Sequence, residues 1–426
     1  MKEEFDAIVV GGGPGGAVAA TFLARANVKT LLIDKARFPR DKACGDAVGG
    51  QSAELLGELG LEPQLAQYRV ARINGEIFTS PKGAEVQIPF APRPPANSHA
   101  GPPVYIIRRM ILDNLLFQLA KSHPAVTMLE SFTVQDLLWK GTQVSGVIGQ
   151  DQHSKIREFG ARVVIGADGA LSKVAEKVGS YDFSHKHHDH WIGAFRSYFE
   201  GVRGLTDNLE IHFVDGLIPG YFWIFPTGDG CANVGAGMLE TDLRGERGAL
   251  RKKKTNIRQV TNAIIASHPR FRPRFENARE VPGTFRGWQL PCGSERRKLA
   301  GNGWMLTGDA ASLIDPFSGE GIPNAMLSGR FAAECAATAL RAGDCSERIL
   351  KSYEQRVWKE LGPQLDISYR LQRIVRHKWL VNLIIGRAAS SAYVRRTIAE
   401  MVADNTKAVQ LTRPSFYLKM FLPGTS

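Results

Sequence analysis

The alternation of apolar and polar positions predicts a strand at the start of the chain and a helix directly after it. Residues 6–10 form a mainly apolar run rich in β-branched side chains, and a helical pattern follows a glycine-rich turn and continues to Ala26. A second apolar run, residues 30–33, ends at Asp34. Strand, helix and strand in this order form a βαβ unit, so we expect a parallel sheet to begin here.

Later segments predict a return to that sheet and a separate antiparallel unit. Residues 162–166 and 304–306 are short apolar runs typical of buried strands, and a long helical pattern covers residues 323–340. Alternating apolar positions predict a group of antiparallel strands over residues 191–199, 209–214, 221–225 and 232–238. The proline-dense stretch 81–103 predicts loops and edge strands rather than a helix.

Length and composition predict a globular protein of more than one domain. A chain of 426 residues exceeds the size at which a single core usually stops growing. Hydrophobic residues make up 43% and charged residues 23%, which excludes collagen-like and wholly disordered chains. We expect a discontinuous first domain from residues 1–75, 104–182 and 283–345, a second from 76–103 and 183–282, and a basic helical region over 346–426.

The cysteines and the apolar runs limit the class of protein and its compartment. Five scattered cysteines without a CxxC pair argue against a zinc ribbon, an iron–sulfur cluster and a secreted disulfide framework. His187 and His190 could chelate a metal, but they stand in a His-rich loop without an HExxH register, so we expect no metal. No signal peptide precedes the first strand and no apolar run is long enough to span a bilayer, which predicts a cytoplasmic protein.

The glycine-rich turn has the spacing of a dinucleotide-binding loop, Gly11-x-Gly13-x-x-Gly16, between a strand and a helix. Gly11 permits the tight turn, Gly13 lets the backbone approach a pyrophosphate, and Gly16 lets the helix pack closely. The helix N-terminus adds amides and a positive dipole, and Asp34 can accept hydrogen bonds from ribose hydroxyls. The alternative, a glycine turn without a ligand, is disfavoured because strand, helix and acid stand in register.

The choice of FAD over NAD depends on two later motifs. Gly308-Asp309-Ala310-Ala311 follows a predicted strand, where Asp309 can hold a ribityl hydroxyl or the second phosphate region; a helix N-cap is the alternative. Together with Gly166-Ala167-Asp168-Gly169, this motif resembles flavoproteins of the p-hydroxybenzoate hydroxylase fold. The resemblance implies an α/β fold with a Rossmann-like FAD-binding domain of the glutathione reductase type, an antiparallel substrate domain and a helical C-terminal region.

A second glycine-rich turn, residues 315–323, precedes the long predicted helix. Amides at such a helix start point toward whatever lies before them, which in a flavoenzyme is the N1–C2=O edge of the isoalloxazine. Negative charge develops at that edge when the flavin is reduced, so these amides would stabilise the hydride-donating form. An ordinary loop is the alternative.

Three further segments resemble the geranylgeranyl reductase family: Lys42-Ala43-Cys44-Gly45-Asp46, Arg109-x-x-x-Asp113, and Tyr221-Phe222-Trp223-Ile224-Phe225-Pro226 with a later Gly235-x-Gly237. The resemblance covers residues 11–329 and implies FAD-dependent reduction of carbon–carbon double bonds in polyprenyl chains of lipids, quinones or pigments. The flavin-binding residues that the motifs and the resemblance together indicate are Gly11, Gly13, Gly15, Gly16, Asp34, Lys35, Cys44, Gly45, Arg109, Asp168, Gly308, Asp309, Gly319, Gly321 and Ile322.

The alternating aromatics of the third segment predict a wall for an isoprenoid. Tyr221, Trp223 and Phe225 share one face of a strand, and with Pro316 they are the expected substrate contacts. Three aromatics that face a dry core are the alternative. Saturation of an isolated alkene also needs a proton donor, for which Cys44, Tyr221 or water are the candidates; Cys44 could equally be a buried inert thiol.

Two other functions use the same flavin site. An aromatic hydroxylase or halogenase of this fold would use oxygen, and a non-catalytic flavin-binding protein would not be reduced by any donor. The electron donor, NADPH or a ferredoxin, stays open, because no second GxGxxG motif is present.

The C-terminal region carries most of the net positive charge. From residue 346 onward, 14 Lys and Arg stand against 6 Asp and Glu, which gives +8 of the total +12. Interleaved apolar and basic residues over 358–384 predict either an amphipathic helix on an anionic membrane surface at the cytoplasmic face or a helical cap packed on the body. Nucleic acid is not expected, since no groove-reading motif is present.

Overall fold

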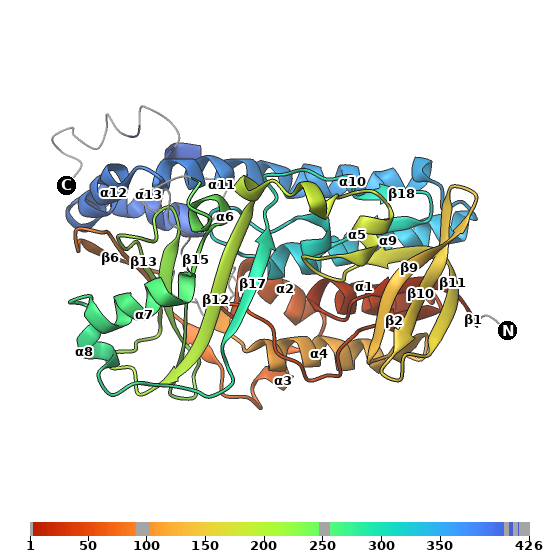
Figure 1. Ribbon diagram of the computed structural model, residues 1–426, viewed down its shortest axis with the longest axis horizontal. Coiled ribbons are helices and arrows are strands. Elements are labelled where there is room, and N and C mark those ends of the chain that lie inside the picture. Colours follow the sequence, from red (N-terminus) through yellow and green to blue (C-terminus); the bar gives the residue numbers. More distant parts are fainter. Residues whose placement is uncertain (1–2, 91–102, 247–255, 404–408, 412–415, 417–426) are drawn as a thin grey trace, which may run out of the picture.

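The computed structural model describes residues 3–90, 103–246, 256–403, 409–411 and 416. These residues form one elongated body with a sheet near each end, and the last helices run along one long side (Figure 1). The chain begins at the end that holds the first sheet. The C-terminal helices reach from there to the opposite end, so they contact both halves of the molecule.

The first sheet contains the βαβ unit that the sequence predicts. Its strands are β1 (Glu3–Val10), β2 (Thr30–Ile33), β8 (Val126–Leu129), β9 (Phe132–Lys140), β10 (Gln143–Asp151), β11 (Ile156–Gly166), β18 (Ala300–Gly301) and β19 (Trp304–Leu306). Within the described residues the order is β18-β19-β11-β1-β2-β8, and β1 pairs in parallel with both β2 and β11. The predicted strands at 6–10, 30–33, 162–166 and 304–306 all lie here. The β9–β10 hairpin, which extends β11, was not predicted.

Two helices pack face to face beside this sheet because glycines let their backbones approach. Helix α1 (Pro14–Arg25) lies against α9 (Ile322–Ala342), the long helix predicted from the sequence. A Cβ at Gly329 would lie 2.1 Å from the carbonyl oxygen of Gly15, and a Cβ at Gly16 would lie 1.8 Å from that of Gly11. Glycine is therefore required at both contacts, and the N-termini of the two helices are brought together.

The second sheet is mostly antiparallel, as predicted. Its strands are β5 (Gly75–Thr79), β6 (Glu85–Pro89), β12 (Trp191–Glu200), β13 (Asn208–His212), β14 (Tyr221–Pro226), β15 (Cys231–Leu239), β16 (Arg279–Glu280) and β17 (Arg286–Pro291). Among the described residues the order is β16-β12-β15-β14-β13-β5-β6, with β17 paired to β12. Because β17 pairs with β12, the chain stays in this sheet as far as Pro291, beyond the predicted boundary at residue 283. Residues 91–102 of the proline-dense stretch lie outside the described residues.

Shorter elements close the space between the two sheets. A small sheet of β3 (Ala47–Val48), β7 (Val104–Ile106) and β4 (Ala71–Ile73) follows the Lys42–Asp46 segment. The remaining helices of the body are α2 (Gly50–Glu58), α3 (Glu62–Leu65), α4 (Arg109–Lys121), α5 (Lys173–Lys177), α6 (Glu240–Leu243), α7 (Ile257–Ser267) and α8 (Arg272–Phe275). Helices α7 and α8 cover the outer face of the second sheet, whose core there includes Phe222, Ile224 and Phe271. The opposite face of that sheet turns inward.

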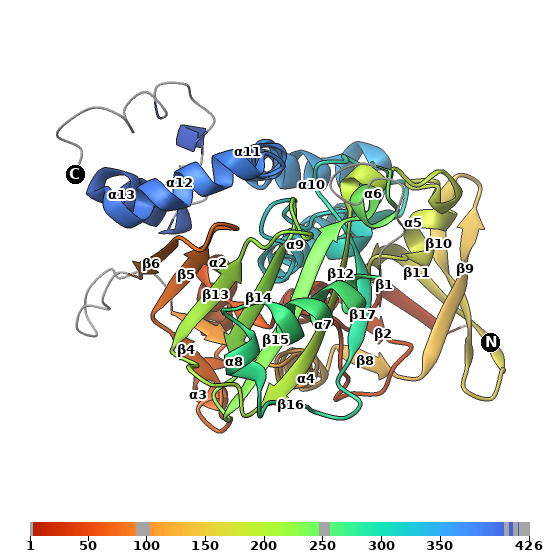
Figure 2. The same cartoon turned by 60° about the vertical axis from the view of Figure 1, so that its left-hand side comes forward.

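The C-terminal region is helical, as predicted, and consists of α10 (Glu347–Glu360), α11 (Gly362–Val375), α12 (Lys378–Ser390) and α13 (Ala392–Ala403). Figure 2 shows α12 and α13 above the β5–β6 edge of the second sheet. Their apolar residues, including Val381, Ile385 and Ile398, form one buried cluster with Val86 and Ile88 of β6. This packing agrees with the helical-cap interpretation and leaves the predicted membrane contact without support, because the apolar face is already covered.

None of the helices in the described ranges combines the length and apolarity that crossing a bilayer requires.

Candidate functional site

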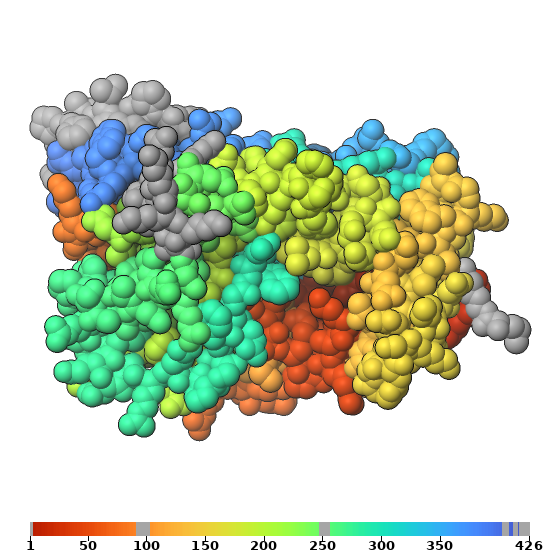
Figure 3. Space-filling view, viewed as in Figure 1, coloured from red at the N-terminus to blue at the C-terminus, as the bar shows by residue number. Residues whose placement is uncertain are grey.

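A cavity of about 1500 Å³ extends between the two sheets, from the glycine-rich loop before α1 to the C-terminal helices. Ligand pockets usually have volumes of about 300–1,000 Å³, so this cavity has room for more than one ligand. In the space-filling view the N-terminal segment (red) is visible between the second sheet (green to teal) and the β9–β11 region (yellow) (Figure 3). The cavity is therefore built from segments that are far apart in the sequence.

The glycine-rich loop has the conformation that the fingerprint predicts. Gly11 adopts φ 105°, and a Cβ there would lie 2.2 Å from the carbonyl oxygen of Ala167, so only glycine fits. Helix α1 starts after Gly13 without a side-chain cap, which leaves its first amides free to bind an anion. Asp34 at the end of β2 accepts hydrogen bonds from the Gly12 amide at 2.7 Å and the Ala36 amide at 2.8 Å, which fixes its carboxylate beside the loop.

The two later aspartates have different surroundings. The Asp168 carboxylate accepts bonds from the Ser172 hydroxyl at 2.5 Å and the Lys173 amide at 2.7 Å, so it caps the start of α5 while it borders the cavity. Asp309 instead forms an ion pair with Lys42, whose Nζ lies 2.8 Å from Asp309 Oδ2. The short helix Gly308–Ala311 has no side-chain cap, so the N-cap alternative for Asp309 is not what the structure contains.

Arg109 is buried at the first position of α4 and is not a surface arginine. Its guanidinium donates to both oxygens of Asp113 at 2.7 Å, and Arg40 donates to the same carboxylate at 2.7 Å. Burial opposes ionisation of Asp113, but Arg109 and Arg40 outweigh it and lower the pKa of that carboxyl group. This fixed positive charge lies directly beside Cys44, with which Arg109 interacts.

The segment after Cys44 is held by a buried hydrogen-bond network that the sequence did not reveal. Asp46 adopts φ 66°, and its Oδ2 accepts from the Tyr198 hydroxyl at 2.5 Å and from Asn233 Nδ2 at 2.7 Å. Asn233 also donates to the Cys44 carbonyl at 2.8 Å and accepts from Trp223 Nε1 at 2.9 Å. The network ties the Cys44 segment to the aromatic strand. Asp46 stood in a motif from the sequence, whereas no pattern pointed to Tyr198 or Asn233.

Burial changes the acid–base properties of this segment. It raises the pKa of the Cys44 thiol, so the group is a thiol and not a thiolate near neutral pH. Burial also raises the pKa of Asp46 to about 6, although Arg196, Tyr198 and Asn233 favour the charged form. The other oxygen of Asp46, Oδ1, has no hydrogen-bond partner among the described residues.

The aromatic residues of β14 share one face, as predicted. The ring centroids of Tyr221 and Trp223 are 5.9 Å apart, and those of Trp223 and Phe225 are 6.2 Å apart. All three border the cavity, while Phe222 and Ile224 pack into the core on the other face. The Tyr221 hydroxyl donates to the carbonyl oxygen of Ser318, which anchors the second glycine-rich turn against this wall.

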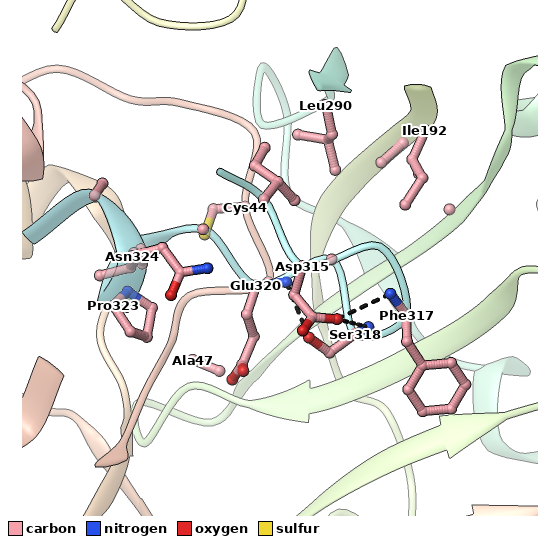
Figure 4. Close-up of a pocket in the computed structure, with 18 of the residues that line it drawn as sticks. Cys44, Ala47, Ile192, Leu290, Asp315, Phe317, Ser318, Glu320, Pro323 and Asn324 are labelled. Atoms are coloured by element: carbon pink, nitrogen blue, oxygen red, sulfur yellow. Dashed lines mark hydrogen bonds between the residues drawn. The ribbon is translucent and has the colours of Figure 1, made fainter. Parts of the chain in front are cut away.

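The second glycine-rich turn leads into α9 as the sequence predicted. Asp315 Oδ1 accepts from the amides of Phe317 and Ser318, each at 2.9 Å, and these bonds shape the turn (Figure 4). Gly319 adopts φ 75°, and α9 begins after Gly321 with no side-chain cap. The unsatisfied amides at this helix start therefore face the cavity, close to those of α1.

The cavity brings together the predicted site residues with one exception. Its lining includes Gly11, Gly13, Gly15, Asp34, Lys35, Cys44, Gly45, Arg109, Asp168, Tyr221, Trp223, Phe225, Gly308, Asp309, Pro316, Gly319, Gly321 and Ile322. Gly16 does not line it, because Gly16 packs α1 against the loop at Gly11. The individual binding and catalytic roles of these residues stay predictions.

The far end of the cavity was missed by the sequence analysis. Apolar residues of the C-terminal helices line it, together with residues of β5 and β6: Phe78, Val86, Ile88, Leu371, Ile374, Val375, Val381, Ile384, Ile385, Ile398 and Met401. We call this end the apolar chamber. The interleaved apolar positions over residues 358–384 gave a signal for an apolar face, but they did not indicate whether a membrane or the protein body covers that face.

Comparisons with known proteins show which families and proteins this chain is similar to. Residues 4–210 match the family described as FAD binding domain. The chain is 33% identical over 343 residues to the menaquinone reductase of Mycobacterium tuberculosis (strain ATCC 25618 / H37Rv), with 78% of this chain and 77% of the relative aligned. It is 30% identical over 378 residues to the digeranylgeranylglycerophospholipid reductase of Methanocella arvoryzae, with 88% of each aligned.

A solved structure has the same fold over nearly its full length. The geranylgeranyl bacteriochlorophyll reductase-like protein of Thermoplasma acidophilum has a TM-score of 0.79 at 20% identity and covers 97% of this chain and 99% of that one. Fold and site thus define an FAD-dependent oxidoreductase with the p-hydroxybenzoate hydroxylase-type architecture. Within this class, the chain belongs to the geranylgeranyl reductase family.

Proposed function

We propose that this enzyme reduces carbon–carbon double bonds of polyprenyl chains of the geranylgeranyl type. The observation that carries the proposal is the continuity of one cavity from the two capless helix N-termini, past the aromatic wall, into the apolar chamber. A dinucleotide and an extended hydrocarbon need these two environments side by side. The names of the relatives, a menaquinone reductase and a digeranylgeranylglycerophospholipid reductase, support the same substrate class.

The residues at the first end of the cavity fit FAD. Gly11 makes a tight turn against the Ala167 carbonyl that no other residue permits, α1 and α9 present free amides, and Arg109 is a buried cation. We propose that the α1 amides receive the pyrophosphate, Asp34 the ribose, and the α9 start the isoalloxazine carbonyl edge. Once bound and reduced, FAD supplies the hydride for an alkene carbon.

The remaining residues hold the hydrocarbon and keep water away. Tyr221, Trp223 and Phe225 present a continuous apolar surface, and Cys44 and Pro316 border the region between that surface and the flavin end. Binding comes mainly from burial of methylene and methyl groups, at about 25 cal/mol per Å² of apolar surface. Such contacts carry no polar direction, so the chain can slide and present successive double bonds.

Mass spectrometry of the products tests this function. Purified protein reduced with dithionite under anaerobic conditions is incubated with geranylgeranyl phospholipid, menaquinone or a geranylgeranylated pigment, and products are scored for mass gains of two hydrogens. Saturation of any of them supports the proposal and identifies the headgroup. Hydroxylated or halogenated product under air, without saturation, would instead support the oxygen-using alternative. Parallel reactions with NADPH and with reduced ferredoxin identify the electron donor.

A further inference from the structure

Two carboxyl groups project into the cavity beside the aromatic wall, and neither was expected from the sequence. Glu76 lies on β5, where it pairs with Leu209 of β13; on β13, Ile211 pairs with Trp223 of β14. Paired residues of neighbouring strands, and residues two apart on one strand, share a face of the sheet. Glu76 is therefore on the same face as Trp223, and its partner in β6 is the apolar Ile88.

The second carboxyl group belongs to the turn that precedes α9. Glu320 lies between Gly319 and Gly321, and its side chain is exposed to the cavity interior (Figure 4). The hydrogen bond from Tyr221 to the Ser318 carbonyl holds this turn against the aromatic wall. In the part of the chain that the structure describes, no lysine, arginine or histidine forms an ion pair with Glu76 or Glu320.

The surroundings shift the pKa of both carboxyl groups from the ordinary glutamate value into the neutral range. Desolvation, followed by the charge of Glu320, raises the pKa of Glu76 to about 8. Desolvation, followed by the charge of Asp315, raises the pKa of Glu320 to about 7. The other titratable groups that face this pair are Tyr221 and Cys44, and burial raises the pKa of both. Each negative charge disfavours ionisation of its neighbour, so the pair retains at least one proton near neutral pH.

We propose that Glu320, with Glu76 next to it, donates the proton for alkene saturation. The inference rests on the proposed function and adds the acid that it needs. The π bond breaks, hydride from the reduced flavin forms one C–H bond, and the Glu320 proton forms the other. The carboxylate then regains a proton from water, and the electron donor, nicotinamide or a low-potential protein, restores the reduced flavin.

A carboxylic acid suits this step better than the candidates from the sequence. The best general acid is still protonated at the working pH but gives up its proton readily. Both Cys44 and Tyr221 have a pKa raised further from neutrality, and the Tyr221 hydroxyl is already committed to the Ser318 carbonyl. Glu320 also lies within the turn that precedes α9, whereas Glu76 lies on the sheet beside the aromatic wall, and both line the same cavity.

Single-turnover kinetics of three variants test the proposal. In the reduced holoenzyme, E320Q should slow prenyl-dependent flavin reoxidation by about 10²–10⁴-fold, the range for loss of a general acid. E320D, which keeps a carboxyl group, should recover part of the rate, and E62Q, at an exposed position on α3, should match the wild type. FAD content and reduction by dithionite should be unchanged in all three variants. These controls distinguish a loss of proton donation from a loss of folded, FAD-loaded protein.

A measurement without substrate or reduction gives a second readout. Infrared difference spectra of the oxidised protein, recorded through a pH titration, should show the carbonyl band of protonated carboxyl groups at neutral pH, weakened in both E320Q and E76Q. If the wild type saturates prenyl chains and E320Q is equally fast, the assignment of Glu320 as the proton donor is overturned and the proposed function stands. If the wild type saturates no prenyl substrate, the proposed function fails and this proposal fails with it.

Discussion

Asn233 donates a hydrogen bond to Asp46 at 2.7 Å, and through this contact the aromatic strand positions the segment that carries Cys44. The same amide accepts from the Trp223 indole at 2.9 Å. One side chain on β15 thus fixes both the wall and the segment opposite it. Because all three groups are buried, loss of one partner leaves at least one buried polar atom with an unmet hydrogen bond.

Replacement of Asn233 by alanine should therefore destabilise the protein and loosen substrate binding. Each buried polar group left without a partner costs about 1–3 kcal/mol; N233A leaves the Trp223 indole N–H without its acceptor and removes one of the two donors to Asp46 Oδ2. Urea denaturation should show the loss, while N277A at an exposed position should not change the midpoint. An unchanged midpoint in N233A would mean that the network contributes nothing to the fold.

Replacement of Asp46 by asparagine should make stability less dependent on pH. The folded-state pKa of Asp46, about 6, exceeds its ordinary value of 3.8, so its favourable contribution is complete below pH 3.8 and is lost as pH rises through 6. Above that pH the ionised carboxylate costs the wild type on the order of 2–3 kcal/mol. We expect D46N to have the higher melting temperature at pH 8 and to lose this advantage in acid. A wild type that is more stable than D46N at pH 8 would show that the attraction between Arg196 and the ionised carboxylate outweighs the cost of burying that charge.

Replacement of Gly16 by alanine should abolish FAD binding. The new Cβ would lie 1.8 Å from the Gly11 carbonyl oxygen, and relief of this clash would displace the start of α1 from the loop. The ratio of flavin to protein absorbance after purification measures the loss. The matched control is G57A in α2, where the added methyl meets only Glu62 at 3.7 Å and should stabilise the helix by about 0.5–1 kcal/mol.

A bulky residue in the apolar chamber should shorten the chains that the enzyme accepts. Ile385 of α12 is buried and lines the chamber, so I385W would fill space that the distal isoprene units need. We expect saturation of a geranyl chain to persist while that of a geranylgeranyl chain falls at least tenfold. W379A, at a side chain on α12 that is 64% exposed, should leave both rates unchanged. Equal losses for the short and the long chain would contradict this placement of the hydrocarbon.

The rate of alkene saturation should decrease as pH rises through neutrality. A general acid acts only while protonated, and the pKa values of about 7 for Glu320 and about 8 for Glu76 move this decrease up from the ordinary glutamate value of 4.5. Asp315, Tyr221 and Cys44 face the same region, and of these only the Asp315 charge raises the pKa of Glu320. Anaerobic single-turnover rates across this range give the profile. The decrease should disappear in E320Q. If the E320Q variant shows the same pH profile as the wild type, the decrease belongs to the titration of another group.

Much of the fold was accessible from the sequence because it depends on short-range constraints. The period of two in residues 221–225 placed three aromatics on one face, and the glycine spacing at Gly11 and Gly16 follows from contacts within one βαβ unit. The sequence could not show that β17 pairs with β12 or that the β9–β10 hairpin extends β11. Such pairings depend on which edges are free once the whole sheet is assembled.

By itself the sequence determined the flavin loop, the strand of aromatics and the family, since each is written in neighbouring residues whose sterics and periodicity act locally. Tertiary structure alone decided that the apolar face of α12 and α13 covers a chamber. It also decided that Glu76 and Glu320, far apart in the chain, enter one cavity. The physical reason is that a pKa and a cavity depend on distances in space, and a linear pattern does not encode which distant carboxyl groups share one cavity.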